Sequence, residues 1–120
     1  MNWYQPCGYD SAQKRAFHAI GRTRLKALAR VLEFPPGSFD LRSNLGGIAV
    51  SGEVTLHHHT LYVQICQPAT GMDTGILIRI CRGRKDYTGG RNHLAPLSLL
   101  DDIPALASRC RHVLSEGDRS

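Results

Sequence analysis

The stretch GEVTLHHHTLYVQICQ, residues 52–67, predicts two β-strands joined by a tight turn. Apolar and polar residues alternate on both sides of its histidines, as they do in strands that bury only one face. The apolar series extends upstream, so the expected strands cover residues 48–57 and 61–67. One face carries Val50, Val54, Leu56, Leu61, Val63 and Ile65, and the other carries Glu53, Thr55, His57, Tyr62 and Gln64. Gly52 interrupts the alternation and indicates a bulge or a close approach of another backbone.

Two further segments extend this sheet. Residues 75–82 predict a third strand, with Ile76, Ile78 and Ile80 on one face and Arg79 on the other. Residues 39–42 fit a shorter strand before the first long one. The connections between these segments are short, which favours an antiparallel meander.

Helical patterns precede and follow the strands. Residues 12–33 have the period of an amphipathic helix, which Pro35 and Pro36 prevent from continuing. Its expected apolar face carries Phe17, Ile20, Ala27, Leu28 and Val31. Arg24 falls within that face, so its charged group either reaches solvent or marks contact with a partner. A second helix is expected to start within residues 99–104, since Asp101, Asp102 and Pro104 suit the first turn of a helix. Its apolar stripe carries Ile103, Leu106, Ala107, Cys110, Val113 and Leu114.

The order of these elements predicts the α+β class, as one domain over residues 1–120 with flexible ends at 1–10 and 116–120. An N-terminal helix, an antiparallel meander of three to four strands and a C-terminal helix would form a two-layer sandwich. The sheet face away from the helices would be bare, exposing Glu53, His57, Tyr62, Gln64 and Arg79. This bare face and Arg24 together suggest a homodimer.

Positive charge is concentrated in two parts of the chain. The 15 Lys and Arg against 10 Asp and Glu give a formal net charge of +5, with a pI near 9.3. Residues 1–45 and residues 79–93 each have a net charge of +4, whereas the sheet-like sequence between them has −2. A basic balance of this kind is typical of many nucleic-acid-binding proteins.

The segment GRKDYTGGRNH, residues 83–93, is the core of the second basic block and lies within an expected loop over residues 83–96. Arginine and lysine side chains bind phosphate, glycine lets a backbone approach it closely, and a tyrosine can stack on a base or a sugar. The candidate phosphate-contacting residues here are Arg79, Arg82, Arg84, Lys85, Tyr87 and Arg91. The segment lacks the pattern of a nucleotide-binding P-loop. A plain polar surface loop is the alternative interpretation.

The N-terminal helix supplies the second candidate surface, Arg15, Arg22, Lys26 and Arg30. Acidic residues are nearly absent from this face, whereas a solvated helix usually mixes both charges. No helix-turn-helix pattern, zinc finger or RNA-recognition signature is present, so no reading of base sequence is expected. The favoured hypothesis is therefore a non-enzymatic, histone-like protein that binds the phosphate backbone of double-stranded DNA, with both basic blocks forming one footprint across a dimer.

Two other function classes remain open. The first is a protein-interaction module that uses the bare sheet face. The second is a metal-dependent phosphodiesterase in which His57 and His59, on one strand face, hold the metal together with a nearby acid. No motif for covalent catalysis is present, and no cofactor is expected.

The cysteines and the N-terminus indicate a compartment. Cys7, Cys66, Cys81 and Cys110 include no C-x-x-C pair, which favours four reduced thiols. The N-terminus has no pattern of a secretory signal, and no apolar run is long enough for a membrane span. The expected location is the cytoplasm, on the nucleoid if the protein binds DNA.

The runs FDLRSNLGGIAVSGEVTLHHHTLYVQICQ and GRKDYTGGRNHLAPLSLLDD, within residues 39–102, resemble small proteins encoded on plasmids and other mobile elements of proteobacteria. The resemblance implies no catalytic residue. It implies an accessory protein of plasmid biology, a setting in which a histone-like DNA-binding protein is one expectation.

Overall fold

The computed structural model describes residues 11–45, 52–67, 75–83, 86–89 and 91–117. For residues 11, 82, 83, 86–89, 116 and 117 the description covers the backbone only. The elements in chain order are α1 (Ser11–Val31), β1 (Asp40–Asn44), β2 (Glu53–His58), β3 (Leu61–Ile65), β4 (Ile76–Gly83), β5 (Asp86–Gly89), β6 (His93–Ala95), the 3-10 helix η1 (Leu97–Asp101) and α2 (Ile103–Gly117). The predicted flexible end at 1–10 and the predicted strand start at 48–51 lie outside the described residues. Of the predicted flexible end at 116–120, residues 118–120 lie outside them, whereas 116 and 117 belong to α2.

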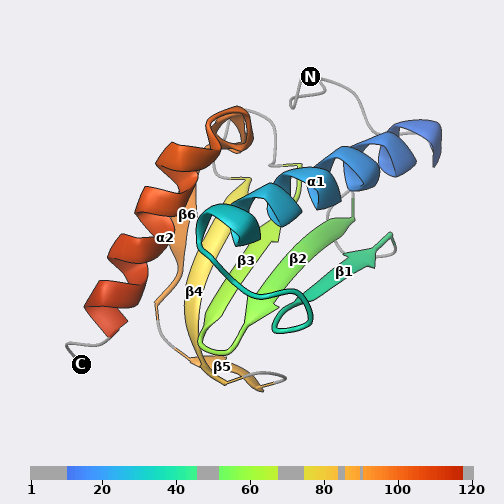
Figure 1. Cartoon of the computed structure of the whole chain (residues 1–120). Helices are drawn as coiled ribbons and strands as arrows, with labels where there is room; N and C mark the ends of the chain where they lie inside the picture. The colour runs from blue at the N-terminus through green and yellow to red at the C-terminus, as the bar shows by residue number, and fades with distance from the viewer. Residues whose placement is uncertain (1–10, 46–51, 68–74, 84–85, 90, 118–120) are drawn as a thin grey trace.

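The two long helices lie on the same side of an antiparallel sheet, which confirms the predicted α+β class (Figure 1). The strand order is β1-β2-β3-β4, and both β5 and β6 pair with the free edge of β4. β6 pairs with the first half of β4 and β5 with its end. α1 contacts β1 and β2, whereas α2 contacts β4, so each helix covers a different half of the sheet.

The core follows the predicted strand alternation. Val54, Leu56, Val63 and Ile65 have no more than 1% exposure, and so does Ile78. The strand register aligns these residues across β2, β3 and β4, which makes one continuous apolar layer beneath the helices. The apolar stripe of α2 closes the layer from above, with Leu106, Ala107 and Cys110 buried. Burial of this side-chain layer is the main stabilising contribution to the fold.

Two glycines allow close approaches that the core requires. A Cβ atom at Gly21 would lie 2.7 Å from Cδ1 of Ile65, so the glycine lets α1 approach β3 closely. Gly52 has a positive φ of 69°, and a Cβ atom there would overlap the backbone oxygen of Asn44. The close backbone approach predicted for Gly52 is thus confirmed.

α1 is rotated by roughly a quarter turn from the predicted orientation, given 100° per residue. The buried stripe includes Leu25 and His18, which is only 5% exposed, whereas the predicted face included Val31, which is 37% exposed. His18 was not part of the predicted apolar face, so the predicted orientation of the helix is wrong at this residue. The rotation brings Gly21 onto the sheet, where a Cβ atom would press against the end of the Ile65 side chain.

α1 ends before the two prolines that were expected to stop it. Glu33 has a φ of 64°, Glu33 N–H donates to Arg30 O and Phe34 N–H donates to Ala29 O. These two bonds form a Schellman motif, in which the residue with positive φ is usually glycine. A glutamate therefore occupies a strained position at this end of α1.

α2 begins where its acids and proline predicted. Asp102 precedes the helix, and its side-chain oxygen Oδ1 accepts a 3.2 Å hydrogen bond from the backbone N–H of Ala105. This is an N-cap contact, and Pro104 within the first turn needs no backbone donor. The preceding residues form the separate 3-10 helix η1.

The segment 83–96 is not the loop that was predicted. β5 and β6 both lie in it, and only residues 84–85 separate β4 from β5. These strands have few apolar residues and no regular alternation, so nothing local marks them. Their pairing with β4 defines them instead.

Candidate functional site

α1 carries an exposed row of basic side chains. Its 21 residues include six Lys or Arg and no acidic residue. Arg15, Lys26 and Arg30 are exposed. At 1.5 Å per residue, the row extends about 17 Å from Arg15 to Lys26 and about 22 Å from Arg15 to Arg30. We call Arg15, Lys26 and Arg30 the α1 row.

The other basic residues of α1 have structural contacts. The Arg22 guanidinium donates to Ser43 Oγ at 3.2 Å and to Leu41 O at 3.4 Å, and Lys14 Nζ donates to Leu45 O at 3.1 Å. These contacts attach α1 to β1 and to the residue that follows it. They also place the α1 row on the β1 side of the helical layer. Arg22, which was predicted to contact phosphate, has its guanidinium partly committed to β1.

Arg24 has a partner within the same chain. Its Nη2 lies 3.5 Å from Oδ1 of Asp101, at the end of η1, and both side chains are partly exposed. The rotation of α1 brings Arg24 to the margin of the buried stripe, where it reaches this carboxylate. One of the two arguments for a dimer is therefore accounted for within the monomer.

Arg79 lies on the sheet face opposite the helices. Its guanidinium carbon is 5.0 Å from the centre of the Tyr62 ring, a cation–π distance, and Tyr62 is its register partner on β3. Its Nε is buried and makes no hydrogen bond to the described residues. Because α1 covers the other face, Arg79 and the α1 row cannot belong to one surface of a single chain.

The sheet face that was expected to be bare is partly closed, so that prediction needs correction. His57 is 2% exposed and Tyr62 is 9% exposed. They are register partners on β2 and β3, and their rings meet edge to face at 5.8 Å. Large side chains on neighbouring strands cover one another here, which alternation within one strand does not reveal. Glu53 and Gln64 are half-buried, and the second argument for a dimer is weakened.

His57 and His59 do not share a strand face, contrary to the prediction. β2 ends at His58, and His59 lies in the exposed turn with a φ of 45°. His57 Nε2 lies 3.1 Å from His59 O. The ring of His58 stacks on Phe34 at 3.8 Å. Across the part of the chain that the structure describes, no group of three or more His, Cys, Asp or Glu is placed to hold a metal ion.

The second basic block is divided between different elements. Arg82 lies on β4 and Tyr87 on β5, where the backbone alone is described, and Arg84 and Lys85 lie outside the described residues. The β4 end lies beside the β2–β3 turn, since Cys81 N–H donates to Thr60 O. Arg91, just before β6, is exposed and lines a cavity against α2.

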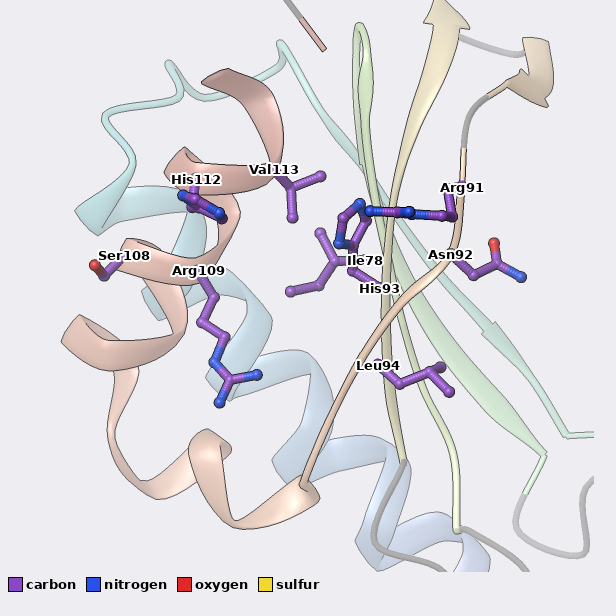
Figure 2. A pocket seen from close by; sticks show the side chains of 9 residues that line it. All are labelled: Ile78, Arg91, Asn92, His93, Leu94, Ser108, Arg109, His112 and Val113. Carbon is purple, nitrogen blue, oxygen red and sulfur yellow. The ribbon is translucent and has the colours of Figure 1, made fainter. Parts of the chain in front are cut away.

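That cavity includes residues that the sequence interpretation did not select. Arg109 and His112 of α2 line it together with Arg91 and His93 (Figure 2). Arg91 lies two residues before His93, the first residue of β6, and Arg109 and His112 are three apart on α2, so the two helix residues face one direction. Those spacings were available signals. Pairing the two elements across the fold was not predictable from spacing alone.

Cys66 and Cys110 are not activated nucleophiles. Cys66, Cys81 and Cys110 are free, and the last two are buried. Burial raises the pKa of Cys110 to about 12, against a smaller lowering by Arg111. Burial, reinforced by Glu53, also raises the pKa of Cys66, while a hydrogen bond with Gln64 lowers it. Both thiols are therefore protonated near neutral pH, which disfavours nucleophilic chemistry.

Neither long helix, within the described residues, combines the length and apolar character that a membrane span requires.

Comparison of the chain with protein-family models, with curated proteins and with solved structures returned no match.

Proposed function

We propose that this protein binds double-stranded DNA through the phosphate backbone, without catalysis and with low sequence specificity. The observation that carries the proposal is the α1 row, three exposed basic side chains on a helix with no acidic residue. A solvated helix gains from mixing both charges, so a helix of one sign suits an anionic partner.

The length and shape of the row suit an extended polyanion. Its roughly 17 to 22 Å matches about five or six base-pair steps along B-DNA, at 3.4 Å per step. Long, flexible side chains on an exposed helix face can reach phosphates without entering a groove. Such contacts hold DNA but carry no information on base sequence.

The basic residues near β5 form the second, separate contact in this proposal. Arg82, Arg84, Lys85 and Tyr87 remain candidates for it, whereas Arg91 is left out because it lines the cavity against α2. Arg79 is omitted, because its guanidinium stacks on Tyr62 and its Nε is buried. A single footprint from both blocks would need two chains, so homodimerisation stays a prediction. Light scattering coupled to size-exclusion chromatography would measure it directly.

Fluorescence anisotropy with a random-sequence duplex tests the proposal. The three phosphate contacts of the α1 row alone predict that affinity falls at least about 40-fold between about 50 and 200 mM salt, since each contributes roughly −0.9 to the salt slope. Two duplexes of unrelated sequence should bind equally well. Absence of binding at the lower salt concentration would refute the proposal and redirect the search to a protein partner. The predicted cytoplasmic, nucleoid-associated location depends on the same result.

A further inference from the structure

A basic cavity lies between α2 and the strand β6, at the opposite edge of the sheet from β1. Its volume is about 680 Å³. Arg91 and His93 extend toward α2, and Arg109 extends from α2 into the gap between helix and strand (Figure 2). Two arginines and two histidines from different elements therefore line one concavity.

The charge of this cavity is unbalanced. None of the described residues that line it is acidic. The acids at the start of the neighbouring helix, Asp101 and Asp102, are engaged elsewhere, one with Arg24 and one as the cap of α2. Two guanidinium groups in a cavity whose lining has no carboxylate give it a positive potential, which a bound anion would neutralise.

The cavity also has an apolar floor. Ile78 is 1% exposed and Val113 is 3% exposed, and both lie between the basic side chains of the strand and those of the helix (Figure 2). Leu94, which is 51% exposed, adds apolar surface at the rim. An inorganic ion would use only the guanidinium groups and would leave the apolar side chains at the floor and rim without a partner. An anion with an organic substituent would use both.

We infer that this cavity binds a small phosphate monoester, with Arg91 and Arg109 on the phosphate and the floor of Ile78 and Val113 under the organic group. Guanidinium groups bind phosphate through paired, charge-assisted hydrogen bonds. An imidazole N–H of His93 or His112 can add a further donor. A monoester phosphate, with three terminal oxygens, can accept from four such side chains, whereas a carboxylate offers only two oxygens. The volume is within the range of small-molecule sites.

This inference does not rest on the proposed DNA binding. The α1 row lies on the β1 side of the helical layer, and the cavity lies on the β6 side. Loss of either activity would leave the other intact, so the two failures can be told apart.

Isothermal titration calorimetry of the full chain with phenyl phosphate is the test. Saturable binding is expected, and Arg91→Ala and Arg109→Ala should each weaken it at least about tenfold, the loss expected for a charged hydrogen bond. Arg42→Ala is the matched control, since Arg42 is an exposed arginine of β1, at the opposite edge, and should bind like the wild type. Absence of saturable heat at millimolar phenyl phosphate, or equal binding by both arginine variants and the wild type, would overturn the inference.

Two further ligands test the chemistry of the site, and one spectroscopic measurement tests its location. Benzoate and phenol should bind more weakly than phenyl phosphate, and equal affinity for either would overturn the assignment to phosphate. Amide signals of the wild type should shift within residues 91–94 and 108–113, and shifts confined to α1 would overturn the location. This readout does not depend on how well the variants fold.

The source of the phosphate is resolved by two ligands. A free deoxynucleoside monophosphate represents a soluble metabolite, and a short 5′-phosphorylated strand represents a nucleic-acid end. Preference for the first supports a metabolite site, and preference for the second supports a strand-end site. Failure of both while phenyl phosphate binds would restrict the site to other monoesters.

Discussion

The two sides of the helical layer carry the same charge in different shapes. On the β1 side, the α1 row is a convex line of exposed side chains. On the β6 side, Arg91 and Arg109 line a cavity that has an apolar floor. A convex row suits a long polyanion that contacts several charges in succession, whereas a concave site suits one small anion with a body attached. The α1 row and the cavity therefore suit different anionic ligands because of their shapes, although both are positively charged.

The largest change in the free energy of unfolding is expected at Gly52, where the backbone before β2 approaches the end of β1. Gly52→Ala would place a Cβ against Asn44 O at a positive φ, so we expect a loss of about 3 kcal/mol in the free energy of unfolding. Gly37→Ala is the matched control, since its φ is also positive but nothing lies within 4 Å, and it should cost only about 1 kcal/mol. Urea denaturation measures both. Equal losses would mean that the close approach at Gly52 contributes nothing.

Two sets of variants, each measured with both duplex DNA and phenyl phosphate, test whether the two surfaces are separate binding sites. Arg15→Ala, Lys26→Ala and Arg30→Ala combined should weaken duplex binding by roughly tenfold or more and leave phenyl phosphate binding unchanged. Arg91→Ala with Arg109→Ala should do the reverse. If both sets weaken both ligands alike, the two sides form one site and the comparison fails.

A smaller change in stability is expected at Glu33, which lies just beyond the C-terminal end of α1. Glu33 has a strained backbone and lines the same hollow as Arg30. Glu33→Gly should stabilise the protein by about 1 kcal/mol, since glycine adopts the φ of 64° without steric cost. Glu33→Ala keeps the strain and should give no such gain, although both variants should bind duplex slightly more tightly. Thermal unfolding that shows equal gains would refute the strain at Glu33.

The smallest effect is expected at the ion pair between the helices. Arg24→Ala removes the contact with Asp101, which is 3.5 Å long and partly exposed, and should cost about 0.5 kcal/mol or less. Duplex affinity should change much less than in the α1 row variants. A large loss of duplex binding from Arg24→Ala would mean that the DNA-binding surface of α1 includes Arg24 as well as the α1 row.

Sequence patterns predicted the parts of the fold that depend on local alternation. Val54, Leu56, Val63 and Ile78 identified the main strands, and the acids and proline identified the start of α2. The rotation of α1 was missed, because His18 is polar and Gly21 has no side chain to mark the buried face. β5 and β6 were missed, because pairing with β4 rather than apolar pattern defines them.

The candidate sites divide in the same way. The α1 row lies within one helix, so its spacing was visible in the sequence, although the partners of Arg22 and Arg24 were not. The cavity requires that α2 and β6 meet across the fold, and only tertiary structure brings Arg109 and Arg91 into the lining of one cavity.

The salt dependence of duplex binding, compared between the wild type and the Arg15, Lys26 and Arg30 triple alanine variant, tests the central claim most directly. Three lost phosphate contacts predict that the slope of log affinity against log salt becomes shallower by about 2.7. Identical slopes for the two proteins would contradict the α1 row as the DNA-binding surface.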